Sequence, residues 1–166
     1  MSQRSRSLMT LGLSRVLSTR TWPCRRLERS DARDLADLLY AAFHGTVDDE
    51  GESHAEAVQE IDRTLNGAYG RLLWDASFVI EQGDVLVSAC VATWYEPLDA
   101  PFVAFTMTRP EHKNRGMARS VMQRSIHALL DAGHSSLWLL VTDANVPAVR
   151  LYTSLGFRKA DEHPRS

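Results

Sequence analysis

Two apolar runs joined by a helical pattern constrain the fold of this chain more than any other feature of its sequence. The first run, PFVAFTMT, covers residues 101–108, and the second, SSLWLLVT, covers residues 135–142. Between them, apolar and small residues recur at helical spacing from Ala118 until Gly133 ends the pattern. A strand, a helix and a second strand connected in this way form a right-handed crossover, so the two strands should run parallel in one sheet.

The sequence before this crossover predicts antiparallel strands. Two β-rich runs, at 77–82 and 85–96, flank the turn pair Gly83-Asp84, which is typical of a hairpin. The run at 101–108 would then be the third strand of a meander. Residues 22–28 could supply a first strand ahead of it.

Helical spacing predicts three more helices outside the crossover. They run from Ser30 or Asp31 to Gly45, over residues 54–65, and from Asn145 to Gly156. Together with the strands, they predict an α/β fold of the mixed α+β kind, in which helices flank a central mixed β-sheet.

Length and charge favour one domain over residues 21–166. The chain has 166 residues, of which 44% are hydrophobic, and this is enough to bury one core. Its net charge of -2 argues against a nucleic-acid-binding surface. Cys24 and Cys90 have neither disulfide-framework nor metal-ligand spacing, so we expect a reduced, cytoplasmic protein without a bound metal.

Residues 1–20 differ in composition from the rest of the chain. They contain four arginines, five serines and no acid. This composition is typical of an organellar transit peptide and also of a disordered tail, and we expect the tail. The apolar piece LMTLGL is too short for a signal-peptide core or a membrane span, so no membrane partner is expected.

The segment EHKNRGMARS, residues 111–120, combines positive charge and glycine where the strand at 101–108 gives way to the crossover helix. The first turn of a helix has unpaired N–H groups and the positive end of the helix dipole, which favour anions. Gly116 would let a phosphate approach the backbone, and Lys113 and Arg115 add positive charge. The spacing matches neither an ATP-binding P-loop nor a dinucleotide-binding motif. Taken alone, the segment could equally be a turn glycine with solvated basic neighbours.

Two blocks of this sequence together resemble the signature blocks of the GNAT superfamily, the Gcn5-related N-acetyltransferases. The family's first block reads Arg or Gln, two residues, Gly, one residue, then Gly or Ala, and here residues 113–118 read KNRGMA. The resemblance covers residues 25–160 in the order of the elements. The asparagine, alanine, tyrosine and final Gly-Phe of the second block correspond to Asn145, Ala148, Tyr152, Gly156 and Phe157.

The resemblance implies that the two parallel strands splay apart and that acetyl-CoA lies between them. The turn at 113–118 would wrap the cofactor pyrophosphate, the strand before it would pair with the pantetheine arm, and Asn145 would contact that arm from the other side. Lys113 in place of Arg or Gln is a mild departure, because backbone groups do most of the binding at such a turn. The threonines at 106 and 108 replace residues that are commonly aliphatic. The residues so assigned to acetyl-CoA are Thr106, Met107, Thr108, Lys113, Asn114, Arg115, Gly116, Met117, Ala118 and Asn145.

By the same resemblance, the chain would transfer an acetyl group directly from acetyl-CoA to a primary amine of a small molecule or a protein. Such a site must stabilise an oxyanion, protonate the leaving thiolate and remove a proton from the amine. We interpret Tyr152 as the acid, because a phenol is protonated at neutral pH. The oxyanion donor would be a backbone N–H near Met107 or Thr108. The strand before the turn has no glutamate, so the candidate base is Glu96, or Asp99, acting through a water.

The acceptor has one clue in the sequence. From His44 to Asp62 there are seven acids and no lysine or arginine. Related folds place this region beside the acceptor slot, so an acidic rim could attract a cationic amine, although a solvated helix and loop is the plainer interpretation.

Two further expectations concern the function and the edge of the sheet. A non-catalytic CoA-binding regulatory or interaction module is the alternative function, supported by the missing strand glutamate. The few residues after Phe157 leave the last strand short, so a partner chain could complete that edge in a homodimer.

Overall fold

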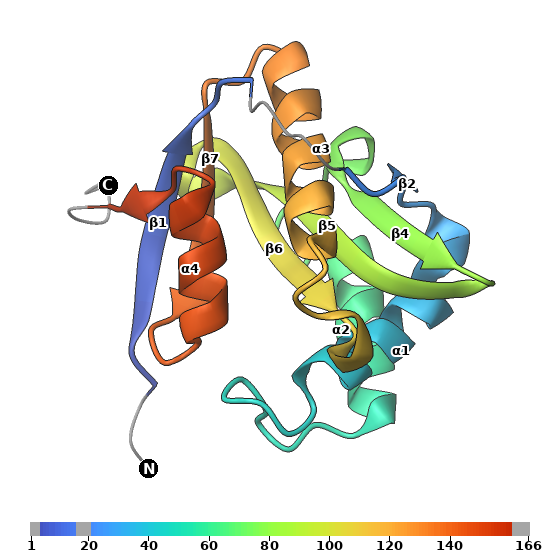
Figure 1. The fold of residues 1–166 in the computed structure, drawn as a ribbon. Coiled ribbons are helices and arrows are strands. Elements are labelled where there is room, and N and C mark those ends of the chain that lie inside the picture. The colour runs from blue at the N-terminus through green and yellow to red at the C-terminus, as the bar shows by residue number, and fades with distance from the viewer. Residues whose placement is uncertain (1–3, 16–20, 161–166) are drawn as a thin grey trace.

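The computed structural model describes residues 4–15 and 21–160, which form a mixed sheet with helices on both faces (Figure 1). The order in the sheet is β2-β4-β5-β6-β7-β1-β8, and β3 pairs with β5 outside this path. The strands are β1 (Arg6–Gly12), β2 (Arg25–Arg26), β3 (Arg71–Leu72), β4 (Phe78–Gln82), β5 (Val85–Tyr95), β6 (Ala100–Thr108), β7 (Ser136–Thr142) and β8 (Arg158–Lys159). The α-helices are α1 (Ala32–Phe43), α2 (His54–Leu65), α3 (Met117–Asp131) and α4 (Val146–Ser154).

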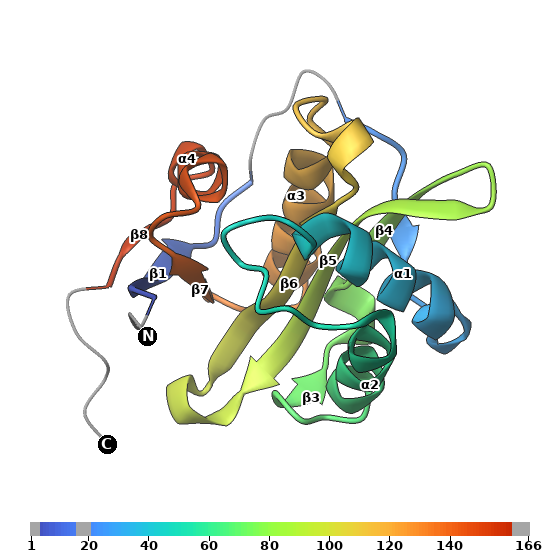
Figure 2. The same cartoon turned by 90° about the horizontal axis from the view of Figure 1, so that it is seen from below.

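The helices form two layers around the sheet (Figure 2). α1 and α2 cover one face, where Leu35 and Ile61 are buried, and α3 and α4 cover the other, where Met122 is buried. β5 serves both layers, because successive side chains of a strand point to opposite faces. Its Cys90 packs toward α3, and its Val91 packs toward α1 and α2. The predicted mixed sheet flanked by helices is confirmed.

The predicted starts and stops of the elements are confirmed where local chemistry determines them. The Ser53 side chain accepts a hydrogen bond from the Glu56 N–H and so begins α2. Gly83 and Asp84 both have positive φ, of 49° and 54°, as a tight hairpin turn between β4 and β5 requires. Gly156 follows α4 with a φ of 102° and ends that helix.

The two strands of the crossover run parallel and then separate. β6 and β7 pair at Phe102 with Trp138 and at Val103 with Leu139, and no further pair joins the two described strands. Figure 1 shows that they diverge toward their carboxyl ends. The expected splay is therefore present, and it leaves one edge of β6 unpaired from Ala104 onward.

The N-terminal segment corrects the expectation of a disordered tail. Residues 6–12 form β1, which pairs antiparallel with β7 along its whole length, from Arg6 with Thr142 to Gly12 with Ser136. Met9 and Leu11 are buried in the core beneath α4. Our expectation rested on the number of arginines and serines in this segment. It overlooked that apolar residues alternate with polar ones around Met9 and Leu11, which is the pattern of a strand with one buried face. Residues 1–3 and 16–20 lie outside the described part of the chain.

β1 also provides the edge that a partner chain was expected to complete. It lies between β7 and β8, and the Ala160 N–H donates to the Leu8 carbonyl oxygen beyond the end of β8. The chain therefore covers this edge of β7 itself. A homodimer remains a prediction, but an uncovered edge of β7 no longer supports it. Within the described residues, no helix is both long and apolar enough to cross a membrane.

Candidate active site

The splay between β6 and β7 opens into a cleft with a volume of about 820 Å³. Its walls are the diverging strands, α4 with its N-cap, the C-terminal part of α1, α2 and the loop between α1 and α2. Thr106, Asn145 and Tyr152, three of the residues expected in the site, line this cleft together. Figure 1 shows that the N-terminal ends of α3 and α4 and the loop between α1 and α2 lie at the same end of the molecule.

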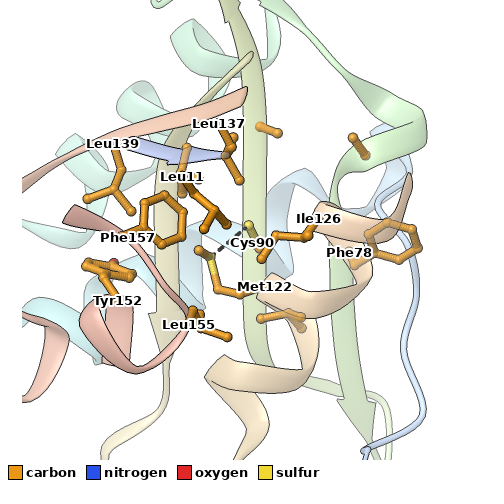
Figure 3. Packing of buried hydrophobic residues seen from close by; sticks show 14 of the residues in the cluster. Leu11, Phe78, Cys90, Met122, Ile126, Leu137, Leu139, Tyr152, Leu155 and Phe157 are labelled. Atoms are coloured by element: carbon orange, nitrogen blue, oxygen red, sulfur yellow. Dashed lines mark hydrogen bonds between the residues drawn. The ribbon is translucent and has the colours of Figure 1, made fainter. Parts of the chain in front are cut away.

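Tyr152 lies on the face of α4 that packs against the core. Its side chain is 8% exposed and meets the ring of Phe157 edge-on, as the two labelled rings in Figure 3 show. Burial raises the pKa of Tyr152 to about 12, and a hydrogen bond with Thr106 opposes part of this rise, whereas Cys90 and Asp48 add to it. The phenol is therefore protonated at neutral pH and is a weaker acid than an ordinary tyrosine. It remains a proton donor whose oxygen lies at the wall of the cleft.

The unpaired edge of β6 presents particular backbone groups to the cleft. In a strand, the N–H and C=O groups of successive residues point to opposite edges. The Arg109 N–H donates to the Val87 carbonyl oxygen, and the Ser88 hydroxyl donates to the Met107 carbonyl oxygen. The backbone of Met107 therefore faces β5, and the backbone groups of Thr106 and Thr108 face the open side. Of the two backbone N–H groups expected to donate to the oxyanion, that of Thr108 points toward the unpaired edge of β6, and that of Met107 points toward β5.

The turn before α3 has the geometry of an anion site. Asn114 and Gly116 have φ angles of 65° and 82°, and α3 begins after Gly116 without a side-chain cap. Among the described residues, none accepts a hydrogen bond from the backbone N–H groups of residues 114–119. An added Cβ at Gly116 would meet nothing closer than Trp22 Nε1, at 4.0 Å, so the space in front of the turn is open. Lys113 and Arg115 are exposed.

Asn145 caps α4 and also contacts Asp48. Its side-chain oxygen accepts a hydrogen bond from the Ala148 N–H at 3.3 Å. Its Nδ2 donates to Asp48 Oδ2 at 2.8 Å, so it joins α4 to the loop between α1 and α2. The plain N-cap is therefore present, and a contact with the cofactor arm remains a prediction.

The comparisons with known proteins agree with this geometry. The model of the family described as FR47-like protein matches residues 86–166. The [ribosomal protein bS18]-alanine N-acetyltransferase of Escherichia coli K12 is 37% identical over 51 residues, which is 31% of this chain and 34% of that protein. The match thus spans about a third of the length of the curated relative.

Solved acetyltransferases share the fold of most of the chain. The structure of the ribosomal-protein-S18-alanine N-acetyltransferase from Escherichia coli superposes with a TM-score of 0.64 at 22% identity, covering 83% of this chain and 78% of that one. The structure of AAC(6')-Iy in complex with the bisubstrate analog CoA-S-monomethyl-acetylneamine superposes with a TM-score of 0.60 at 14% identity, covering 87% and 93%. The chain has the GNAT fold, and its C-terminal half matches the FR47-like family.

The residues expected to supply the base do not line the cleft. Glu96 lies at the end of β5, is exposed, and does not line the cleft, and the same holds for Asp99. Their positions follow from the direction of β5, which runs antiparallel to β6 and so ends where β6 begins. The sequence indicated that Glu96 lies near β6, but it did not show at which end of β6.

The acidic stretch, in contrast, does border the cleft. Six of its seven carboxylates line the cleft against two arginines, Arg6 and Arg63, and Asp62 lines another part of the surface. This part of the cleft is therefore strongly negative. The cleft-lining members are Asp48, Asp49, Glu50, Glu52, Glu56 and Glu60.

Sequence reasoning missed two residues of the GNAT site. Arg6 of β1 lines the cleft and forms an ion pair with Glu50 at 3.5 Å. Trp22 Nε1 donates to the Arg115 carbonyl oxygen at 2.7 Å, and the Trp22 N–H donates to Ser120 Oγ at 2.9 Å, so this residue braces the turn before α3. Recognising residues 6–12 as a strand with one buried face could have indicated that Arg6 belongs to the folded domain. No local pattern pairs Trp22 with a turn so far along the chain.

The described residues contain no group of three or more His, Cys, Asp or Glu side chains that could hold a metal ion.

Proposed function

We propose that this chain transfers an acetyl group from acetyl-CoA to a primary amine of a cationic acceptor. The observation that carries the proposal is the wedge between β6 and β7. It has an unpaired backbone edge on one wall and a buried, protonated tyrosine on the other. A thioester lying between them would have donors for its carbonyl oxygen and for its leaving sulfur.

The turn at 113–118 fits the pyrophosphate of acetyl-CoA. Its N–H groups, from which no described residue accepts, together with the open space before Gly116 and the start of α3 favour an anion. From there, the unpaired edge of β6 would lead the pantetheine arm toward Thr106 and the cleft. The amide groups of that arm can pair with a strand edge as a neighbouring strand does.

The chemistry at the cleft needs a donor for the thiolate and a donor for the oxyanion. Tyr152 would give its proton to the sulfur as the carbon–sulfur bond breaks. Because burial raises the pKa of Tyr152, the phenol stays protonated until that step. The Thr108 N–H faces the cleft side of β6 and would donate to the oxyanion.

The acceptor side favours a cation. Six carboxylates and two arginines leave this end of the cleft negative, and charges of one sign around a concave site attract ligands of the opposite sign. Both relatives named above act on amines, an alanine amino group in one and neamine as part of the bound analog in the other. We expect a small polyamine, an amino sugar or a basic peptide terminus as the acceptor.

The first test is calorimetric titration of the full chain with acetyl-CoA, followed by thiol release in the presence of spermidine, neamine or a peptide with N-terminal alanine. A Gly116→Glu variant should lose binding, by at least about tenfold, because its side chain would place bulk and negative charge in the phosphate position.

The matched control is Gly133→Glu at the other end of α3. Gly133 also has a positive φ, of 91°, and open space around it, so the backbone strain and the charge are the same. It should bind acetyl-CoA like the wild type. Equal loss in both variants, or no binding by the wild type, would contradict the cofactor site. Binding without thiol release for any of the three amines would favour the non-catalytic module.

A further inference from the structure

The proposed transfer needs a group that removes a proton from the acceptor ammonium, and β6 does not supply one. None of its residues from Ala100 to Thr108 is acidic, and Glu96 and Asp99 lie outside the cleft. The carboxylates that line the cleft are therefore the candidates. The hydrogen bonds and ion pairs that each one makes distinguish them.

Most cleft carboxylates are already engaged. Asp49 accepts from the N–H groups of Gly45 and Gly51, one with each oxygen. Glu50 pairs with an arginine, and Glu52 accepts from the Glu50 N–H.

The carboxylates of α2 are no better placed. Glu60 accepts from the Tyr69 hydroxyl and pairs with Arg63. Glu56 is exposed near the start of α2.

Asp48 differs from the other carboxylates in position and in partners. It is half-buried, its Oδ2 accepts from Asn145 Nδ2, and within the described ranges no lysine, arginine or histidine pairs with it. Its own N–H donates to the Thr46 hydroxyl at 3.2 Å, and that hydroxyl donates to the Phe43 carbonyl oxygen at 2.8 Å. One carboxylate oxygen is thus fixed, and Oδ1 is left for a ligand.

Asp48 is also the carboxylate that acts on the catalytic tyrosine. Of the charged groups around Tyr152, Asp48 is the acid whose field raises the pKa of that phenol. Both residues line the same cleft, and Asn145, which donates to Asp48, is the N-cap of the helix that carries Tyr152.

We propose that Asp48 is the general base of the acetyl transfer, and that it binds the acceptor ammonium and takes one of its protons. This assignment rests on the proposed function. Oδ1 of Asp48 would accept the proton as the N–H bond breaks, and the freed nitrogen lone pair attacks the thioester carbonyl carbon. The carbon–sulfur bond then breaks, and the sulfur takes the proton of Tyr152. The nitrogen gives its second proton to the resulting tyrosinate, and the proton on Asp48 leaves to solvent, so the charges and atoms balance.

The test is Asp48→Asn, which keeps the shape and can still accept from Asn145. Removal of a general base lowers turnover by about 10²- to 10⁴-fold. We expect a loss of this size in kcat with every amine among spermidine, neamine and the alanine peptide that the wild type acetylates, while the Kd for acetyl-CoA changes less than about threefold. Asp48→Glu, which restores a carboxylate, should recover part of the loss.

Two further variants test whether Asp48 acts as the general base or only joins its loop to α4 through Asn145. Asn145→Ser keeps a capping hydroxyl for α4 but removes the bond to Asp48, and it should cost less turnover than Asp48→Asn. Asp62→Asn removes an acid of the same stretch that lies outside the cleft, and its turnover should equal that of the wild type.

The outcomes can be told apart. An active wild type with an equally active Asp48→Asn variant would overturn this assignment and leave the proposed function standing. Loss in Asn145→Ser as large as in Asp48→Asn would mean that Asp48 serves only as a bridge. A wild type that acetylates none of the three amines would overturn the proposed function and this assignment with it.

Discussion

At the scale of single residues, Tyr152 links catalysis to stability. Its pKa in the folded protein is about 12, against 10.0 for the free side chain, so the folded state holds this proton more tightly than the unfolded state. Its contribution to stability is therefore complete below pH 10 and is lost as the pH rises to about 12. The loss amounts to about 3 kcal/mol.

Tyr152→Phe should therefore lower turnover at neutral pH and flatten the alkaline loss of stability. We expect kcat to fall about 100-fold or more, because the thiolate loses its proton donor. In urea unfolding at pH 8 and pH 11, the wild type should lose more free energy of unfolding than the variant. Burial also raises the pKa values of Cys24 and Cys90 to about 11, but these thiols contribute equally to both proteins. Wild-type turnover in the variant would remove Tyr152 from the role of acid.

Trp22 should act on the cofactor through the turn that it braces. In Trp22→Phe the Arg115 carbonyl oxygen loses its donor, worth about 1 kcal/mol, and the turn before α3 becomes less fixed. We expect the Kd for acetyl-CoA to rise about three- to tenfold in calorimetric titration. Trp138→Phe is the control, since its Nε1 donates to Ser136 on β7. An unchanged Kd in Trp22→Phe would show that the turn is held without this contact.

At the scale of elements, β1 is a structural strand of the sheet. Met9 is 3% exposed and packs beneath α4, so Met9→Ala should lower the free energy of unfolding by about 2–5 kcal/mol. Thr10 alternates to the other face and is half-buried, and Thr10→Ala should cost less than about 1 kcal/mol. Chemical unfolding of the full chain measures both. If neither substitution changed the free energy of unfolding, residues 6–12 would be a tail and not a strand of the sheet.

The elements also show how far the sequence can predict such a molecule. The helices α1 to α4, the β4–β5 hairpin and the turn at Gly116 follow from local periodicity, caps and glycine conformation, and these predictions were confirmed in outline. Pairing between distant segments is not encoded in any local window. For this reason β1 was taken for a tail, and the sequence did not show that Glu96 would lie outside the cleft.

At the scale of the whole molecule, the candidate site is assembled from segments far apart in sequence. β1 contributes Arg6, the loop between α1 and α2 contributes Asp48, and α4 contributes Asn145 and Tyr152. The motif residues of the turn and of α4 were named from the resemblance to the GNAT blocks, and their roles remain predictions. Arg6 and Trp22 were not predicted, because their contacts depend on which distant segments the sheet brings together.

The position of β1 has a consequence for how the protein is made. During synthesis β1 leaves the ribosome early, whereas β7, the strand that it must join, is made only after the crossover helix. Until then its apolar residues have no sheet to enter, and pairing of such distant segments is slow. The wall of the cleft that carries Arg6 would therefore form only after β7 has been made.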